Sequence, residues 1–204
     1  MIATPKIYSL FVCLLIFGGL AFFISQSGYC RRSSLSSNHV PSHTASLKDL
    51  LKEKNIPPRE LHIEVSKKQY RLNVVYGKTI IKSYPVVLGS DPVNDKRMEG
   101  DGCTPEGSFR IQSKYPHNKW SKFMWLNYPT NESYQKHRQS KKEGEIPAHA
   151  KIGGEVGIHG VRAGQEFLVR SGINWTKGCI SLQNDHIDEL YEVIQANTEV
   201  IIYK

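Results

Sequence analysis

The chain has 204 residues and an ordinary hydrophobic content of 39%, which argues against disorder throughout and suits one domain with a terminal extension. Its formal net charge of +8 fits nucleic acid, a membrane surface or an anionic polymer such as a cell-wall glycan. The lysines and arginines are spread along the chain, and no nucleic-acid-binding motif occurs. We therefore expect no nucleic acid partner.

The N-terminal segment, residues 1–30, is expected to meet a membrane. Residues 7–24 contain no charged side chain, and a run of this length is about the minimum that spans a bilayer. We expect an uncleaved signal anchor. The alternative is a cleaved signal peptide, with Ser25 and Ser27 as the small residues before the cut. In both cases the rest of the chain is exported.

Residues 31–58 are expected to form a linker and a short helix. The first half of this segment is rich in serine and poor in large apolar side chains, which is typical of a flexible linker. Ser46 is placed to cap the helix that follows, and Pro57 and Pro58 are placed to end it. The folded domain then occupies residues 59–204.

Strands dominate the pattern of this domain, which predicts an α+β fold that is mainly β. Apolar and polar residues alternate over residues 61–89, and this predicts three successive antiparallel strands. Further strands are predicted at 108–116, 122–129 and 198–204, with short buried strand ends at 154–160 and 178–182. A loop is predicted at 91–107, and residues 131–145 form a polar surface excursion for which a helix is one interpretation. Asn184 is expected to cap a last helix.

One cysteine lies in a setting that suits nucleophilic chemistry. Gly178 directly precedes Cys179, so a substrate carbonyl can approach the backbone closely and both amides can face a developing oxyanion. A thiol needs a base to become a thiolate, and His159, which lies among small residues, is the candidate. The carbonyl of Gly160 can hold the imidazole in the correct tautomer. The alternative is a small, buried structural thiol.

The predicted domain contains one other cysteine, Cys103, in its glycine-rich loop. We interpret it as a partly buried loop thiol, with a reversible disulfide to Cys179 as the alternative. The histidines lack the spacing of a zinc site, so neither a metal nor a cofactor is predicted. The histidines most simply interpreted as surface residues are His62, His117, His137 and His186.

The motif "IHG…TKGCISLQN" resembles the L,D-transpeptidase catalytic domain, also called the YkuD domain. The residues that match its pattern are His159, Gly160, Thr176, Gly178, Cys179, Ile180 and Asn184. The upstream loop also resembles a family segment, through Glu99-Gly100-Asp101 and Thr104-Pro105-Glu106-Gly107. The resemblance covers about residues 60–203. This loop and Trp175 are most similar to a Gram-negative periplasmic-type branch of the family.

The resemblance implies a mixed β-sandwich or barrel-like fold with short helices. It also implies that Cys179, with His159 and Gly160, forms a thioester with a peptidoglycan stem peptide, which an acceptor amine then resolves. The products would be 3→3 cross-links or an attached wall lipoprotein. Hydrolysis of stem-peptide or protein–peptidoglycan bonds at the same site is one alternative, and an inactive cell-wall-binding module is another. The chain would act in the periplasm or cell envelope, tethered to the inner membrane if its first segment is not cleaved.

Two positions depart from the family pattern. Ser181 stands where many members have arginine, and Lys177 stands where histidine is common. Lys177 either lowers the pKa of Cys179 through its charge or is simply solvated. Together with Thr176, Gly178 and Asn184, these two residues form the candidate oxyanion and substrate-binding group. The departures leave the acceptor undefined.

Overall fold

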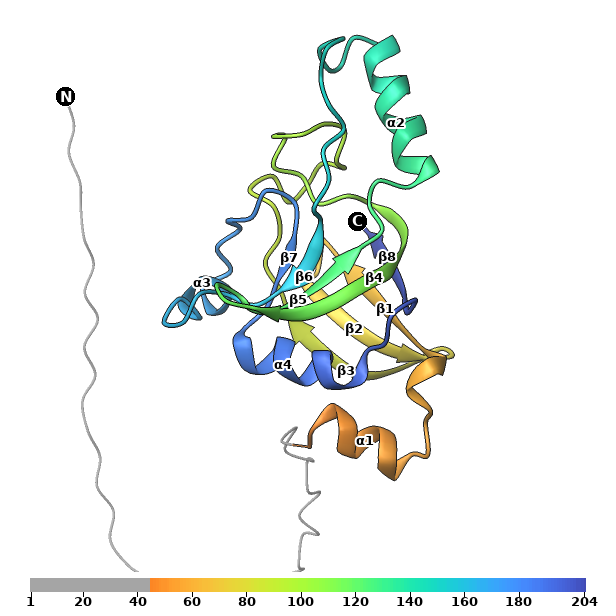
Figure 1. Cartoon of the computed structure of the whole chain (residues 1–204), viewed down its shortest axis with the longest axis vertical. Coiled ribbons are helices and arrows are strands. Elements are labelled where there is room, and N and C mark those ends of the chain that lie inside the picture. The colour runs from red at the N-terminus through yellow and green to blue at the C-terminus, as the bar shows by residue number, and fades with distance from the viewer. Residues whose placement is uncertain (1–44) are drawn as a thin grey trace, which may run out of the picture. The chain divides into compact units, whose positions relative to one another are not determined.

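The computed structural model describes residues 45–204, so the predicted membrane segment and most of the predicted linker lie outside the described residues. The helices are α1 (Leu47–Glu53), the 3-10 helix η1 (Pro58–Glu60), α2 (Asn131–Lys142), α3 (Phe167–Arg170) and α4 (Asn184–Val193). The strands are β1 (Leu61–Ser66), β2 (Arg71–Tyr76), β3 (Thr79–Pro85), β4 (Gly107–His117), β5 (Ser121–Leu126), β6 (Gly157–His159), β7 (Ile180–Ser181) and β8 (Glu199–Tyr203). The predicted mainly β fold with short helices is confirmed (Figure 1). Within residues 45–204, no helix is long and apolar enough to cross a bilayer.

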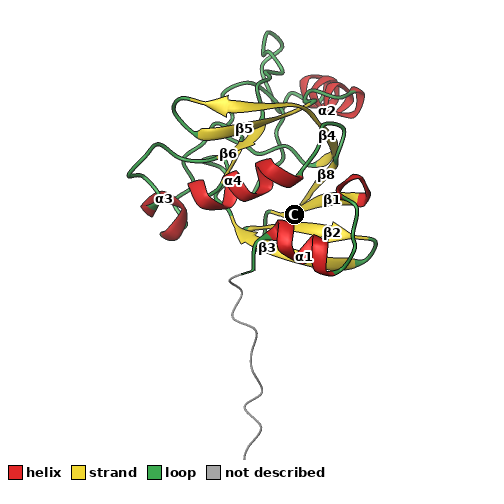
Figure 2. Cartoon of the chain, turned by 60° about the horizontal axis from the view of Figure 1, so that its bottom comes forward, coloured by secondary structure: helices red, strands yellow, loops and turns green. Residues whose placement is uncertain are grey.

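The strands form one mixed sheet in the order β3-β2-β1-β8-β4-β5-β6-β7. As the alternation predicts, β1, β2 and β3 pair antiparallel in succession. The long strand β4 belongs to both halves of the sheet, because its start pairs with β8 and the remainder pairs with β5. A register shift between Ile111 and Ser113 lies at this changeover, and such irregularities bend a strand. Figure 2 shows the resulting two layers, one with β1–β3 and one with β4–β6.

The chain that follows β3 joins the two edges of the sheet. Val87 bridges Ser181 of β7, with reciprocal N–H to carbonyl hydrogen bonds of 3.0 and 2.8 Å. A second bridge connects Gly89 and Thr176. These contacts give the barrel-like arrangement that the resemblance implies, and they fix the two-residue strand β7 from both sides. The side chains buried inside include Ile63, Leu88, Ile158, Ile180 and Leu182.

The segment between β5 and β6 projects from the sheet and carries α2 (Figure 1). Lys136 fastens this helix to the glycine-rich loop, because its ammonium donates to Asp95 Oδ2 and to Glu106 O, both at 2.9 Å. His137 is 7% exposed, and its Nδ1 lies 2.6 Å from Arg97 O. The prediction that His137 is a surface residue is therefore wrong, since even this polar helix buries the face that packs on the loop.

Helices α1 and α4 differ in whether a side chain caps their N-terminus. The hydroxyl of Ser46 accepts the Asp49 N–H at the start of α1, as predicted. Helix α4 begins after Gln183 and has no side-chain cap. The predicted cap at Asn184 is wrong because that residue lies inside the helix and its amide bonds to other segments.

Glu189 on α4 ties together α1, β3 and α4. Its carboxylate accepts from Leu47 N–H, from Lys82 Nζ at 2.6 Å and from Tyr84 Oη at 2.9 Å. The Tyr84 side chain is almost fully buried, and burial together with the adjacent carboxylate raises the pKa of its hydroxyl. The phenol therefore stays a donor to Glu189 at any ordinary pH.

Glu189→Ala is expected to lower the free energy of unfolding by about 1–3 kcal/mol, because the buried Tyr84 hydroxyl loses its acceptor. Chemical denaturation measures this change. The control is Glu192→Ala on an exposed position of the same helix, expected within about 0.5 kcal/mol of the unchanged protein. Equal losses in the two variants would contradict the linking role of Glu189.

Candidate active site

The predicted nucleophile and base meet on one face of two neighbouring strands. Strands β6 and β7 are parallel, with Ile158 opposite Ile180 and His159 opposite Ser181. Cys179 lies two residues before Ser181, and side chains two apart on a strand point to the same face. Cys179 is therefore the diagonal neighbour of His159, within reach of a shared substrate.

The His159 imidazole is held as a neutral base. It is 2% exposed, and its Nδ1 lies 2.6 Å from the carbonyl oxygen of Gly160. A carbonyl can only accept, so Nδ1 carries the proton and Nε2 keeps a lone pair for a substrate or thiol proton. The predicted contact between His159 and the Gly160 carbonyl is thus present in the structure. Burial lowers the pKa of His159 to about 4, against the opposing effect of the Gly160 bond.

Aromatic rings enclose the imidazole. Trp120 and Phe123 stack with it at centroid distances of 4.6 and 5.5 Å, and Trp175 meets it edge-on at 5.7 Å. These rings remove water from the imidazole, which is the physical cause of its lowered pKa. They also leave it only a narrow range of orientations.

The Cys179 thiol is protonated in the resting site. Its Sγ donates to the Glu155 carbonyl oxygen at 3.4 Å. Burial raises the pKa of Cys179 to about 11, with backbone contact to Gly157 and the charge of Lys96 acting in the opposite direction. The pair is therefore a neutral thiol beside a neutral imidazole, and a thiolate forms only when His159 accepts the proton.

Thr176 clamps the turn that presents the cysteine. Its hydroxyl accepts the Gly178 N–H at 3.1 Å and donates to the Cys179 carbonyl at 2.7 Å. The Gly178 amide is therefore already used, and the prediction that it faces an oxyanion is wrong. The Cys179 amide has no acceptor within residues 45–204, so this donor remains open.

Gly178 is required at its position for two reasons. Its φ of +136° lies in the region that side chains rarely adopt, and a Cβ there would lie 2.7 Å from the Cys103 carbonyl oxygen. The glycine-rich loop thus packs directly on the turn that carries Cys179.

Ser181 and Asn184 support the histidine from behind. The Ser181 hydroxyl donates to the Gly160 carbonyl at 3.2 Å. Asn184 accepts the Val161 N–H at 2.9 Å and donates to Glu166 Oε1 at 3.1 Å. A Cβ on Gly160 would lie 2.3 Å from Asn184 Oδ1, so the backbone here is tightly enclosed. Both residues position His159, although we expected them to contact substrate.

The buried cation next to the Cys179 turn is Lys96, which the sequence did not single out. Lys177 is exposed, consistent with the solvated interpretation. The Lys96 side chain is 3% exposed and pairs with Asp101 Oδ1 at 2.8 Å. Its ammonium lies 3.7 Å from the position that a Gly178 Cβ would take. Nothing in the local segment "NDKRMEGDG" distinguishes Lys96 from the other lysines of the chain. Its burial depends on a turn some eighty residues away in the sequence.

The Lys96–Asp101 ion pair is oriented between the two cysteines. Its carboxylate accepts the Cys103 N–H at 3.0 Å, whereas its ammonium faces Gly178. Burial and the charges of Asp101 and Asp91 raise the pKa of Cys103 to about 11. Both thiols are free, and the Cys103 Sγ donates to Asp101 O at 3.5 Å while that of Cys179 faces Glu155. The disulfide between them stays a prediction.

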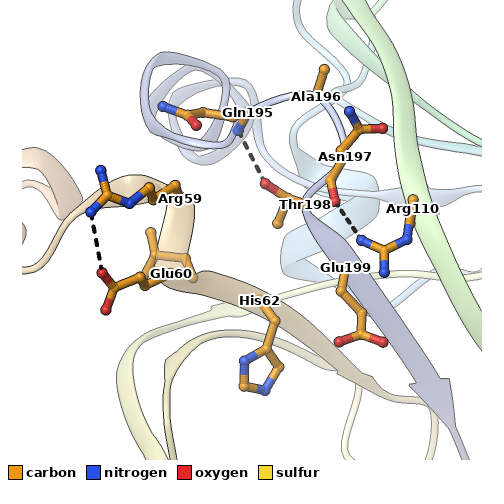
Figure 3. Close-up of a pocket in the computed structure, with 10 residues that line it drawn as sticks. Arg59, Glu60, His62, Arg110, Gln195, Ala196, Asn197, Thr198 and Glu199 are labelled. Carbon is orange, nitrogen blue, oxygen red and sulfur yellow. Dashed lines mark hydrogen bonds and ion pairs between the residues drawn. The ribbon is translucent and has the colours of Figure 1, made fainter.

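A hollow lies elsewhere on the domain and does not contribute to this site. It opens at the starts of β1 and β8 (Figure 3), and β8 is separated from β6 by β4 and β5 in the sheet order. Its charged side chains already have partners, with Arg59 paired to Glu60 at 3.8 Å and Arg110 donating to Asn197 O at 3.0 Å. Within residues 45–204, no group of three or more side chains could hold a metal ion.

The comparisons with known proteins show the family of the chain. The family model of the L,D-transpeptidase catalytic domain, YkuD, matches residues 60–202. The chain belongs to this family of enzymes, and the match includes the Cys179–His159 pair and the glycine-rich loop.

The fold is also similar to solved structures. Bd1075 of Bdellovibrio bacteriovorus is 23% identical, with a TM-score of 0.48 over 71% of this chain and 48% of its own. An L,D-transpeptidase of Mycobacterium smegmatis is 14% identical, with a TM-score of 0.47 over 71% of this chain and 59% of its own. The helical cell shape determining protein Pgp2 of Campylobacter jejuni is 18% identical, with a TM-score of 0.49 over 78% and 55%. The chain thus spans less than two thirds of these proteins. A search of curated proteins finds no significant match.

Lys96→Met is expected to slow alkylation of Cys179 by iodoacetamide, because a positive charge beside the thiolate is removed. We expect a three- to tenfold lower rate near pH 8, roughly the effect of 0.5–1 pKa unit. Peptide mass mapping separates Cys179 from Cys103. Lys177→Met is the matched control and is expected to change the rate less than about twofold.

The variant Lys96→Met/Asp101→Asn removes both charges and guards against effects of an unpaired, buried Asp101. It is expected to slow Cys179 alkylation as well, with the melting temperature followed in parallel. The proposed role of Lys96 is refuted if neither Lys96 variant slows the alkylation of Cys179. A slower rate in Lys177→Met would then assign the effect to Lys177.

His159 is expected to make the domain less stable in mild acid. The unfolded chain binds a proton at this histidine below a pH of about 6.5, whereas the folded chain does so only near pH 4. Stability is therefore lost as pH falls through this window, by up to about 1.4 kcal/mol per pH unit. Urea denaturation of the unchanged protein and of His159→Gln should show their stability difference shrinking by roughly 2–3 kcal/mol between pH 7.5 and 4.5. Parallel pH profiles would contradict the buried neutral imidazole.

Proposed function

We propose that this domain transfers acyl groups of peptidoglycan stem peptides, with Cys179 as nucleophile and His159 as general base. The observation that carries the proposal is the Nδ1 contact of His159 with the Gly160 carbonyl. It leaves Nε2 as the free base on the face that carries the Cys179 thiol. Membership of the L,D-transpeptidase catalytic domain family supplies the substrate class.

In the first step, Nε2 of His159 takes the proton of the thiol as Sγ attacks the carbonyl carbon of the third stem residue. The carbonyl becomes a tetrahedral oxyanion, and its peptide bond to D-alanine then breaks. The amine of D-alanine leaves with the proton held by His159, and the acyl group remains on Sγ as a thioester. A base with a pKa near 4 returns this proton readily.

In the second step, an acceptor amine attacks the thioester carbonyl. His159 takes a proton from the amine, the new amide bond forms, and the carbon–sulfur bond breaks. The sulfur recovers the proton, which regenerates the neutral pair. Transfer to the amine of a neighbouring stem gives a 3→3 cross-link, and transfer to a lipoprotein amine anchors that protein. With water in place of the amine, the same steps give hydrolysis.

Two groups support the oxyanion in this proposal. The open N–H of Cys179 is a direct donor at the attacked carbonyl, in place of the Gly178 amide that Thr176 occupies. The buried Lys96 ammonium supplies positive potential on the same side of the turn. In a site with little water, a fixed charge acts strongly on both the thiolate and the oxyanion.

We further infer that the chain works outside the cytoplasm, where the polymer is found. An apolar N-terminal segment, residues 7–24, and a net charge of +8 support this placement. The segment lies outside the described residues, so whether it anchors the chain in the inner membrane is part of the proposal.

Cys179→Ala is expected to abolish activity on purified muropeptides, because no thioester can form. Mass spectrometry of the digest identifies dimers joined at third residues after transfer and shortened stems after hydrolysis. The unchanged protein should also gain the mass of one carbapenem molecule, since the opened ring acylates the thiol. We expect Cys103→Ala, which removes the other thiol of the domain, to keep both reactions. An unchanged digest and an unmodified mass for the unchanged protein would refute the proposal and favour a wall-binding module.

A further inference from the structure

Aromatic side chains cover one face of the β4–β5 hairpin and continue to the catalytic histidine. We call this group the aromatic shelf; it consists of Tyr115, His117, Trp120, Phe123 and Trp125. Tyr115 lies opposite Phe123, and Phe123 lies opposite His159. The three rings are stacked in succession, with centroid distances of 5.7 and 5.5 Å. A single row of rings therefore crosses three strands and ends at the general base.

The shelf is on the side of the hairpin that faces away from the main core. The alternate residues Met124 and Leu126 point the other way and are fully buried in the core cluster. On the shelf, only Phe123 is buried, and the other four rings remain partly exposed. Packing of the core does not require these rings, and partly exposed aromatic clusters beside a site commonly bind a ligand.

We propose that the aromatic shelf binds the glycan strand of peptidoglycan and so directs the attached stem peptide to Cys179. This inference rests on the proposed function and deepens it, because it assigns the sugar part of the substrate to named side chains. The ligand class is a β-1,4-linked N-acetylhexosamine polymer.

The chemistry of the shelf suits a sugar. The flat faces of such hexosamines carry C–H groups of slight positive charge, which complement the negative faces of aromatic rings. Two of the rings are also spaced for consecutive contacts, since the ring centroids of Tyr115 and Trp125 lie 6.5 Å apart. The Tyr115 hydroxyl, the Trp125 N–H and the hydroxyl of Ser113, opposite Trp125, offer hydrogen bonds to sugar hydroxyls and acetamido groups.

The reach of the stem peptide fits the position of the shelf. Neighbouring strands are about 4.8 Å apart, so Tyr115 lies two strand spacings, roughly 10 Å, from His159. A peptide spans at most about 3.3–3.6 Å per residue, so three extended residues cover roughly 10 Å. A sugar held at Tyr115 therefore brings the third stem residue, which is the one attacked, as far as His159, and Cys179 directly precedes the adjoining strand β7.

A free stem peptide is the competing occupant of the same rings, and the two occupants make different demands. A free stem peptide would not need to contact Tyr115, because it can place its third residue at the Cys179 thiol without occupying the far end of the shelf. A glycan would need Tyr115 and Trp125, whereas the rings packed on His159 are those of Trp120, Phe123 and Trp175. Substitutions at Tyr115 and Trp125 therefore separate these possibilities, whereas substitutions at Trp120 or Phe123 would disturb His159 itself.

The test measures sugar binding without catalysis. The full chain carrying Cys179→Ala is titrated with a β-1,4-linked N-acetylglucosamine hexamer, which has no stem peptide. Adding Tyr115→Ala and Trp125→Ala is expected to weaken binding at least about tenfold. Tyr76→Ala, which removes an exposed tyrosine on β2, is the matched control and is expected to stay within about twofold. Absence of hexamer binding by the Cys179→Ala chain overturns the proposal.

A second measurement uses the active chain and compares a disaccharide-linked tetrapeptide with the free tetrapeptide. The ratio of their kcat/KM values is expected to fall about tenfold in Tyr115→Ala/Trp125→Ala. An equal loss on both substrates overturns the glycan assignment and indicates a peptide site. The variant Tyr115→Leu/Trp125→Leu keeps apolar volume but not the ring faces, so it should show the same fall if the double alanine variant does not fold. If the chain binds the sugar hexamer but shows no activity on muropeptides, the proposed acyl transfer is refuted and the proposed sugar binding is not.

Discussion

The contact between Nδ1 of His159 and the Gly160 carbonyl determines how the rest of the site is built. A buried imidazole has no water to fix its tautomer, so one backbone oxygen must do so. That oxygen also accepts the Ser181 hydroxyl, and the next residue, Val161, is held by Asn184. Aromatic rings then exclude water from the ring face. Each of these features serves one geometry, in which Nδ1 carries the proton and Nε2 keeps its lone pair.

The second constraint on the site is electrostatic. Two cysteines lie near one buried ion pair, and the ion pair presents opposite ends to them. Burial is the main cause that raises the pKa of both thiols to about 11; the charge of Asp101 raises that of Cys103 further, whereas the charge of Lys96 lowers both. The loop therefore contributes to the electrostatics of both thiols and also supports the turn beneath Gly178.

The sequence was sufficient for the succession of β1 to β3 and for the contact of His159 with the Gly160 carbonyl, because each depends on neighbours in the chain. Alternation predicts β1 to β3, and the motif around His159 and Cys179 predicts the pair. The errors arise where a group had two possible partners. Gly178 N–H bonds to the Thr176 hydroxyl, Asn184 holds Val161 and Glu166, and His137 packs on Arg97 O. Lys96 was missed because its burial depends on a contact between distant segments, which local spacing does not encode.

The bridge between Val87 and Ser181 has a consequence for how the protein matures. Strand β7 is two residues long, and it is fastened both to β6 and to the segment after β3. These partners are far apart in sequence, and such non-local pairings form late because a long loop must close first. The Cys179 turn therefore reaches its final conformation only after nearly all of the domain has folded. A chain that has not yet formed these pairings does not hold Cys179 next to the strand that carries His159.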